Sequence, residues 1–291
     1  MCKTGSLKSK NIEIVRRVAD LRGLVSDWRK AQFTIGLVPT MGAIHSGHQS
    51  LVTAAKSRCD KVIASIFVNP AQFGENEDLA DYPVDEEQDV ISLTDAGTDI
   101  IFSPSSSEVY PKGFTTAVTV SRLAAGLCGP FRPGHFEGVA TVVTKLLLQA
   151  LPDIAIFGEK DYQQLLVIRQ LVKDLNIPVN IIGAPIIREN DGLAMSTRNQ
   201  YLSHHERQIA AELYLILKLV VERVKERPSE CESISRLART KLLEKGFEAV
   251  DYITICDNET LNPVSTFKGN ARVLGAARLG TARLIDNIPI L

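Results

Sequence analysis

Residues 34–52, TIGLVPTMGAIHSGHQSLV, decide how the first half of the chain folds. An apolar, β-branched run that ends at Pro39 predicts a buried strand. The residues after the Gly-containing turn Met41-Gly42 predict a helix. A strand followed by a tight turn and a helix N-terminus is the usual place at which α/β proteins bind phosphate. We therefore expect a nucleotide to bind at this junction.

Two histidines, His45 and His48, stand at the start of this helix with Gly47 between them. Their spacing of three places both side chains on one helix face, and the glycine leaves room for a nucleotide to approach the backbone. His-x-Gly-His at such a junction suggests nucleotidyl transfer at the α-phosphate of ATP. The alternative, a pair that only caps the helix or lies on the surface, stays open. The turn contains neither GxxxxGK[ST] nor GxGxxG, so the P-loop and dinucleotide interpretations fail.

Composition limits the class of protein. The chain has 291 residues, is 45% apolar and carries a net charge of −1; a prior of about 100–200 residues per domain suggests two domains. Without a basic field, no nucleic-acid partner is expected. The five cysteines form no CxxC pair, which argues against disulfides and zinc and favours a reducing compartment. MCKTGSLKSKN lacks the apolar core of a signal peptide, and no apolar run approaches the roughly 20 residues that span a bilayer. We expect a cytoplasmic protein without a membrane partner.

Strands and helices alternate up to about residue 188, which predicts an α/β fold with a doubly wound parallel sheet over residues 1–188. Besides the strand in the opening stretch, short apolar runs predict buried strands at 61–70, 99–104, 153–158 and 179–189, and a weakly alternating run predicts an edge strand at 115–120. Helices are expected at 12–30, 84–96, 136–151 and 161–175, and a Gly/Pro-rich loop at 121–135.

The pattern changes after residue 188. A polar loop at 191–203 precedes two helices and then three strands, which predicts a smaller α+β domain over residues 189–291. The helices are expected at 204–226 and 231–245, and the strands at 249–257, 271–280 and 281–288, the last two joined by a tight Leu-Gly-Thr turn.

Polar side chains follow two predicted strands at their carboxyl ends, the edge at which open α/β sheets bind ligands. Asn69 and Gln72 follow one strand, and their neutral amides suit hydroxyl and carboxylate groups. After the other strand, Lys160 suits a phosphate, Asp161 a ribose hydroxyl and Gln164 a substrate. Each stretch alone has a structural alternative, a strand cap or a surface turn.

Two loops add further candidates. In MSTR, Ser196 and Thr197 can donate hydrogen bonds while Arg198 adds charge, a combination that suits a phosphate clamp. In CGPFRPGHFEG, Arg132 and His135 lie among glycines and prolines, in a loop that could fold over a site. An exposed loop and a structural turn are the alternatives for these two stretches.

Taken together and in order, five stretches resemble the pantoate–β-alanine ligase family: VPTMGAIHSGH, SIFVNPAQF, RPGHFEGVATVV, PDIAIFGEKDYQQLLVIRQLV and DGLAMSTRNQYLS. They extend from residue 38 to 203, and weaker similarity continues to GTARLIDN. The resemblance implies a Rossmann-type domain followed by a smaller C-terminal domain, and a homodimer. It also implies an ATP- and Mg²⁺-dependent condensation of pantoate with β-alanine through pantoyl-adenylate, releasing AMP and pyrophosphate.

The resemblance also implies residue roles. Gln72 and Gln164 hold pantoate, and β-alanine enters near Gln72. Independently of the resemblance, the motifs described above make Asn69, Arg132 and His135 further candidate substrate-binding residues. ATP lies along Met41, Gly42, His45, Gly47, His48, Gly158, Glu159, Lys160, Asp161, Ile187, Met195, Ser196, Thr197 and Arg198. The expected catalytic groups are His45, His48, Lys160, Ser196 and Arg198, with His48 aligned to a proton donor. The metal ligands are not assigned.

The chain departs from the family at Tyr82-Pro83-Val84-Asp85, where Tyr-Pro-Arg-Thr is usual, so a role for a charge at position 84 is in doubt. Asp89 matches a family acid, but its role in metal binding stays open. Two other functions remain as alternatives. An adenylyltransferase of the same superfamily acting on a phosphorylated cofactor precursor would need more basic residues in the acceptor pocket. A nucleotide-binding regulator without chemistry would tolerate loss of His48 or Lys160.

Overall fold

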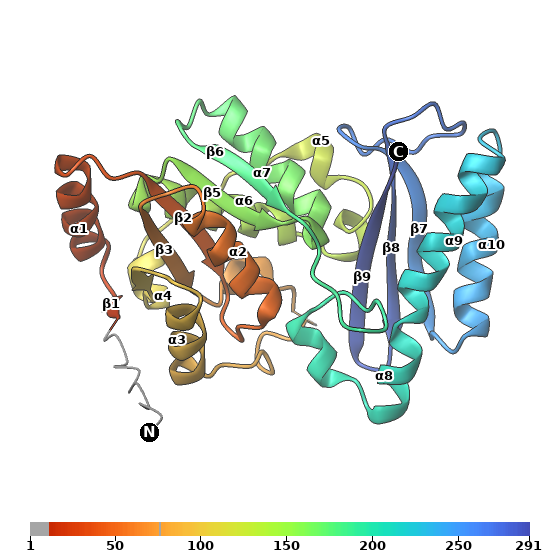
Figure 1. Cartoon of the computed structure of the whole chain (residues 1–291), viewed down its shortest axis with the longest axis horizontal. Coiled ribbons are helices and arrows are strands. Elements are labelled where there is room, and N and C mark those ends of the chain that lie inside the picture. Colours follow the sequence, from red (N-terminus) through yellow and green to blue (C-terminus); the bar gives the residue numbers. More distant parts are fainter. Residues whose placement is uncertain (1–11, 76) are drawn as a thin grey trace, which may run out of the picture.

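The computed structural model describes residues 12–75 and 77–291. Within them, a parallel sheet has the strand order β1-β4-β3-β2-β5-β6 (Figure 1). Its strands are β1 (Glu13–Val15), β2 (Ile35–Thr40), β3 (Lys61–Ile66), β4 (Ile100–Phe102), β5 (Ile154–Gly158) and β6 (Asn180–Ala184). From β2 the chain adds β3 and β4 toward one edge of the sheet. It then returns to the other side of β2 and adds β5 and β6 toward the opposite edge. This order confirms the predicted Rossmann-type sheet and puts its switch point between β2 and β5, where such sheets bind ligands.

Side chains along β2 point alternately to the two faces of the sheet, and each face packs against a different set of helices. Ile35 and Leu37 pack in one core with α1 (Val18–Lys30), α6 (His135–Ala150) and α7 (Tyr162–Asp174). Val38 packs in another core with α2 (Ser46–Lys56) and α3 (Glu86–Asp95). A Cβ at Gly36 would lie 3.3 Å from the Ala55 Cβ, so this glycine lets α2 lie close to β2. The central strands are therefore covered on both faces, as their continuous apolar runs predicted.

A second, antiparallel sheet contains β7 (Ala249–Asp257), β8 (Ala271–Leu279) and β9 (Ala282–Ile290). After the short α8 (His204–Ala210), α9 (Glu212–Glu226) and α10 (Cys231–Glu244) cover one face of this sheet. Its opposite face adds Tyr252, Cys256 and Leu274 to the core of the first sheet. The α+β prediction is confirmed, and the domain boundary at residue 188 stays a prediction.

Several predicted elements differ from the structure. Residues 13–15 of the predicted helix 12–30 form β1, because they pair with β4 at the edge of the sheet. Residues 115–120 form no strand within the described chain, and the Val118 N–H donates to the Thr141 hydroxyl instead (2.9 Å). The predicted strand 179–189 is shorter, since β6 ends at Ala184 before a proline. The predicted helix 204–226 is interrupted at Ala211.

Short helical segments lie between the longer elements. They are α4 (Ser106–Val109), α5 (Ser121–Ala124), and the short 3₁₀ helices η1 (Pro70–Gln72), η2 (Gly129–Phe131), η3 (Glu159–Asp161) and η4 (Thr197–Tyr201). The loop predicted at 121–135 thus contains α5 and η2. The turns η1, η3 and η4 carry candidate site residues.

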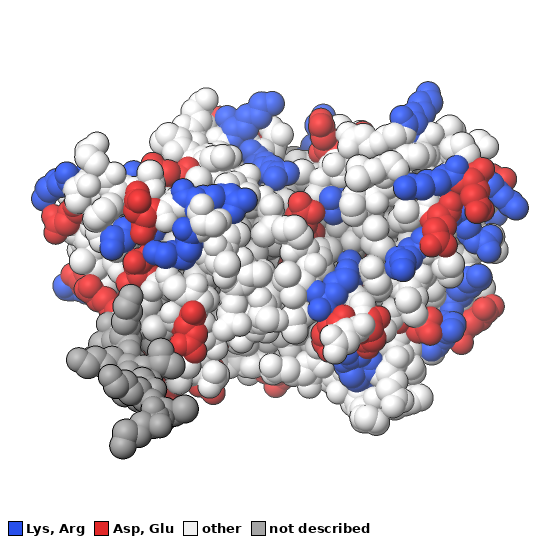
Figure 2. Space-filling model, viewed as in Figure 1, with Lys and Arg blue, Asp and Glu red and all other residues white. Residues whose placement is uncertain are grey.

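The surface agrees with the balanced composition. On the face drawn in Figure 2, basic and acidic side chains are interspersed rather than gathered by sign. Among the described residues, no helix combines the length and apolar character needed to cross a bilayer. The four cysteines in the described part of the chain, Cys59, Cys128, Cys231 and Cys256, are free and buried; Cys2 lies outside the described residues.

Candidate active site

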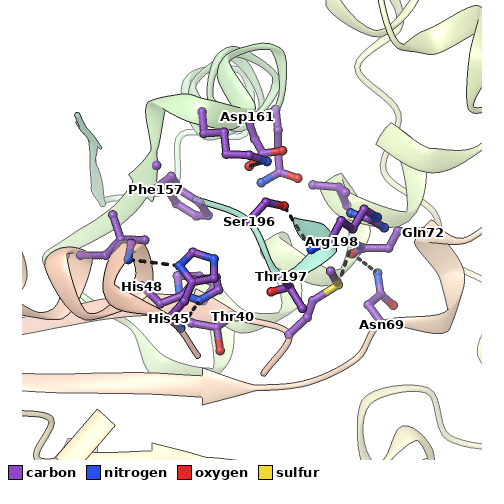
Figure 3. A pocket seen from close by; sticks show the side chains of 18 of the residues that line it. Thr40, His45, His48, Asn69, Gln72, Phe157, Asp161, Ser196, Thr197 and Arg198 are labelled. Atoms are coloured by element: carbon purple, nitrogen blue, oxygen red, sulfur yellow. Dashed lines mark hydrogen bonds and ion pairs between the residues drawn. The ribbon is translucent and has the colours of Figure 1, made fainter. Parts of the chain in front are cut away.

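One pocket at the carboxyl ends of β2 and β5 collects side chains from distant stretches of sequence (Figure 3). The predicted site residues that line it are Met41, His45, Gly47, His48, Asn69, Gln72, Arg132, His135, Gly158, Lys160, Asp161, Gln164, Ile187, Met195, Ser196, Thr197 and Arg198. Two predicted ATP residues, Gly42 and Glu159, are not among those that line it. The sequence did not single out the apolar wall, which includes Phe67, Phe157, Val139 and Val143, or the ring of Tyr82.

The two histidines both cap α2 and line the pocket. His45 Nδ1 accepts from the Gly47 N–H (3.1 Å), and His48 Nδ1 accepts from the His45 N–H (3.3 Å). Because Nδ1 is the acceptor in both rings, each neutral imidazole carries its proton on Nε2. The ring centroids are 4.0 Å apart. The capping and catalytic interpretations are therefore compatible, since capping leaves two Nε2–H donors for a ligand.

Both imidazoles are neutral at pH 7 in the free pocket. Burial lowers the pKa of His48 to about 3, and the nearby His45 contributes in the same direction. Burial, and then the charge of Lys160, lowers the pKa of His45 to about 4. His48 thus acts here as a neutral hydrogen-bond donor. A protonated His48 requires a bound anion, such as a triphosphate, to raise its pKa.

A buried carboxylate, Asp89, holds the turn between β2 and α2. It accepts hydrogen bonds from the Ala43 N–H (2.9 Å) and the Ile44 N–H (2.7 Å), and is 3% exposed. Ala43 has a φ of 49°, which is uncommon for a residue with a Cβ. A Cβ at Gly42 would lie 2.7 Å from Asp89 Oδ2, so Gly42 allows this carboxylate to approach the turn. Gly42 is thus structural, and Asp89 positions the turn without lining the pocket.

The amides after β3 form a supported pair. The Asn69 amide donates to Gln72 Oε1 (3.0 Å) and the Gly138 carbonyl (3.1 Å), while its oxygen accepts from the Tyr110 hydroxyl (2.7 Å) and the Ala71 N–H (3.3 Å). Its hydrogen-bonding groups are thus used within the chain. Among the described residues, Gln72 donates only to the weak acceptor Met41 Sδ (3.1 Å). Gln72 therefore remains available to a ligand, and Asn69 orients it.

The turn η3 is supported by the last strand of the antiparallel sheet. The Asn287 amide on β9 donates to the carbonyls of Glu159 (2.9 Å) and Lys160 (3.0 Å). Glu159 itself faces Arg272 (3.5 Å) rather than the pocket. These contacts leave the side chains of Lys160 and Asp161 at the pocket wall.

Two acidic residues hold the arginines of the pocket. Arg198 donates from Nε and Nη2 to Asp78 (2.9 and 2.8 Å), and Arg132 donates from the same edge to Glu77 (2.8 and 2.5 Å). Thr197 Oγ1 donates to the Ala43 carbonyl (3.2 Å), which fixes the MSTR loop against the phosphate turn. No local pattern pointed to Glu77 or Asp78, because their partners lie far along the chain.

Gln163 was also missed. Its amide donates to the carbonyls of Leu123 and Gly126 (both 2.8 Å) and accepts from the Cys128 N–H (3.0 Å). It therefore anchors the loop that carries Arg132. Its neighbour Gln164 lines the pocket. Of these two neighbouring residues on α7, Gln163 is therefore structural and Gln164 is a candidate ligand-binding residue.

The described residues contain no cluster of three or more His, Cys, Asp or Glu side chains that could hold a metal ion alone. Asp161 is the carboxylate that lines the pocket, with 48% of its side chain accessible. Burial alone would raise the pKa of Asp161, but Lys160 and Arg198 together keep it below its ordinary value. It is ionised at neutral pH.

A family model described as pantoate-beta-alanine ligase matches residues 13–289. The chain belongs to the pantoate–β-alanine ligase family. Similar curated relatives are the pantothenate synthetases of Paramagnetospirillum magneticum, 51% identical over 97% of this chain and 99% of the relative, and of Rhodospirillum rubrum, 49% identical over 96% and 99%.

Two solved ligases of this family share the whole fold. A pantothenate synthetase from Thermus thermophilus has a TM-score of 0.90 and 44% identity, covering 96% of this chain and 99% of that one. A pantoate–β-alanine ligase from Francisella tularensis, complexed with β,γ-ATP and β-alanine, has a TM-score of 0.81 and 37% identity, covering 96% and 97%. Val84, the position at which a departure from the family is expected, is 73% exposed and does not line the pocket.

The Asp89 contacts lead to a test. Asp89→Asn supplies one carbonyl oxygen for two backbone amides and turns an NH₂ donor toward one of them. We expect a loss of about 1–3 kcal/mol in the free energy of unfolding, and slower adenylate formation because the turn loosens. Urea unfolding and ATP–pyrophosphate exchange measure the two effects. Asp95→Asn, at an exposed residue of the same helix, is the control; equal effects for both variants would contradict the positioning role.

The buried histidines predict how stability depends on pH. Burial lowers the pKa of His135 to about 4, as it does that of His45. The unfolded chain therefore binds more protons between its ordinary histidine pKa, about 6.5, and these values, so stability is lost as pH falls through this range. Thermal unfolding from pH 7 to 4 should show a shallower loss for His135→Gln than for the unmodified chain. An unchanged slope for His135→Gln, or a change as large for the exposed His205→Gln, would refute this expectation.

Proposed function

We propose that this enzyme condenses (R)-pantoate with β-alanine to form pantothenate, using ATP, through a pantoyl-adenylate, and releases AMP and pyrophosphate. Its membership in the pantoate–β-alanine ligase family supports the overall reaction. The observation that carries the mechanism is that paired imidazoles, two cations of the expected phosphate site and two glutamine amides line one pocket. They are His45 and His48, Lys160 and Arg198, and Gln72 and Gln164.

The first half-reaction joins two anions. The pantoate carboxylate is ionised at pH 7, so its attack on the α-phosphorus of ATP needs no general base. It needs alignment and stabilisation of charge on the phosphates. The Nε2–H groups of His45 and His48, the Lys160 ammonium and the Ser196 hydroxyl are placed to supply it. Gln72 and Gln164 hold pantoate on the acceptor side.

Mg²⁺ enters this scheme with ATP. Protein sites often bind Mg²⁺ through one or two carboxylates together with substrate phosphates. The ionised Asp161 at the pocket wall fits that need, and the described residues have no separate metal cage. Asp161 would hold the ion, which when bound neutralises charge on the phosphates.

In the second half-reaction, the β-alanine amine attacks the acyl carbon and AMP leaves. The amine must first lose a proton, and no side chain is assigned as its base. The adenylate must also be kept from water. The loops at 125–135 and 191–203 line the pocket through Arg132 and through residues 195–198, and are the segments suited to exclude it.

We also propose a cytoplasmic homodimer. Residues 115–120 carry a strand-like sequence but pair with no strand in the described chain, and an unpaired stretch with strand-like sequence is suited to pairing between two copies. The rival acceptor, a phosphorylated precursor, would need several cations around its phosphate, whereas the acceptor side offers the amides of Gln72 and Gln164 and the guanidinium of Arg132, which is already paired with Glu77. A regulator without chemistry would not need the two Nε2–H donors.

The direct test is ATP–pyrophosphate exchange with pantoate present and β-alanine absent. Exchange should depend on pantoate, and AMP should appear when β-alanine is added. Exchange only with a phosphorylated acceptor, or ATP binding without turnover of any acceptor, would favour the respective rival.

His48→Ala removes one of the two Nε2–H donors. If it acts as an oxyanion-type donor does, adenylate formation should slow about 10²- to 10³-fold, or about 2.7–4 kcal/mol. Pre-steady-state measurement of pantoyl-adenylate checks this, with the exposed His205→Gln as the control. A rate near that of the unmodified enzyme would remove His48 from the mechanism.

Gln72→Ala should weaken pantoate binding more than ATP binding, by roughly tenfold in the pantoate KM, because a hydrogen bond to a charged group is lost. Steady-state kinetics with each substrate varied in turn measure the difference, with the exposed Gln208→Ala as a control. Equal losses for both substrates would be inconsistent with the assigned role.

A further inference from the structure

Three cationic side chains line the pocket, and they differ in the groups that surround them. Among the described residues, the Lys and Arg side chains that line the pocket are Arg132, Lys160 and Arg198. Lys160 lies close enough to the imidazoles for its charge to lower the pKa of both. Arg198 follows Thr197, which is bonded to the carbonyl of Ala43 in the phosphate turn. Lys160 therefore lies on the nucleotide side. Arg198, which the proposed function assigns to the phosphates, is held by Asp78 and lies beside Gln72 (Figure 3). Arg132 is the pocket cation that is not yet assigned to an anion.

Arg132 lies on the acceptor side. His135 Nδ1 is 2.9 Å from the Gln72 carbonyl. Because a carbonyl only accepts, Nδ1 carries the proton, and Nε2 accepts from Arg132 Nη1 (3.0 Å). A chain of two hydrogen bonds thus fixes the Arg132 guanidinium relative to the residue that is expected to hold pantoate.

The guanidinium keeps donors for a ligand. Glu77 accepts from Nε and Nη2 but is not among the residues that line the pocket, so it holds Arg132 from outside. Glu77 and His135 use three of the five N–H groups of the guanidinium. The side chains of Arg132 and Glu77 are only 15% and 20% exposed, so the pair is screened little by solvent.

The chemistry of the second substrate matches this group. β-Alanine carries a carboxylate two methylene groups from its amine, and the amine must reach the acyl carbon beside Gln72. Its carboxylate must therefore meet a cation within a short distance of Gln72, and guanidinium is the side chain best suited to carboxylates. Building on the proposed function, we infer that Arg132 binds the carboxylate of β-alanine and selects this amine, with Glu77 and His135 as positioning residues.

The rival explanation is that Arg132 only ties its own loop to Glu77. Amine selectivity separates the two explanations. n-Propylamine has a methyl group in place of the carboxylate and a similar amine. With ATP and pantoate saturating, kcat/KM for β-alanine divided by that for n-propylamine reports recognition of the carboxylate, whereas general damage to the site lowers both values.

The ratio is measured for the unmodified enzyme and for Arg132→Gln, Arg132→Lys, Glu77→Gln and the double variant Glu77→Gln/Arg132→Gln. Arg132→Gln should lower it roughly 10- to 100-fold, and Arg132→Lys should lower it less because the charge remains. Glu77→Gln breaks the same ion pair but keeps the guanidinium, so the ratio should change less than about fivefold. The ratio for the double variant should equal that for Arg132→Gln. This result would exclude repulsion between the β-alanine carboxylate and an unpaired Glu77 as the cause of the lower ratio.

An unchanged ratio in Arg132→Gln, or equal losses in Arg132→Gln and Glu77→Gln, would overturn the inference. Pantoate-dependent ATP–pyrophosphate exchange is measured first on the unmodified enzyme: its absence refutes the proposed function, whereas exchange with unchanged selectivity refutes only the role of Arg132. Should Arg132→Gln not fold, propionate is tested on the unmodified enzyme at saturating pantoate. Competitive inhibition against β-alanine supports the carboxylate subsite, and its absence overturns it.

Discussion

The backbone amides of the turn between β2 and α2 require acceptors, and nearly every feature of the site depends on which groups supply them. Asp89 satisfies the amides of Ala43 and Ile44, and the Nδ1 atoms of His45 and His48 satisfy those of Gly47 and His45. Using Nδ1 in this way fixes the tautomer of both rings. The same interactions that begin the helix therefore set the direction of the hydrogen bonds offered to a ligand.

The site is assembled from both sheets. The parallel sheet brings the ends of β2, β3 and β5 to one edge. The antiparallel sheet supports that edge through Asn287 and Arg272. The loop carrying Arg132 is anchored by Gln163 on α7. Residues that touch a ligand are thus positioned by side chains that do not, and single substitutions outside the pocket can alter its geometry.

The side chains that the sequence placed after two strands line one pocket in the structure, because parallel strands bring their carboxyl ends to one edge and their apolar runs are easy to find. Prediction from the sequence failed where tertiary pairing overrides local pattern. Residues 13–15 fit a helical stripe but pair with β4, and 115–120 alternate like a strand without one beside them in the described chain. Gly42 and Glu159 belong to site motifs yet face Asp89 and Arg272. The sequence around Glu77 and Asp78 did not indicate their roles, because the arginines that they bind lie 55 and 120 residues away.

The support that Asn287 gives to the turn at residues 159–160 has a consequence for biosynthesis. Asn287 lies 127 positions after Lys160, and a ribosome makes the chain from its N-terminus. The nascent chain can therefore form the strands and helices around the pocket while β9 is still to be synthesised. During that interval it lacks the amide that holds the backbone of Lys160. The nucleotide side of the site is thus completed late, once β9 has emerged and paired with β8.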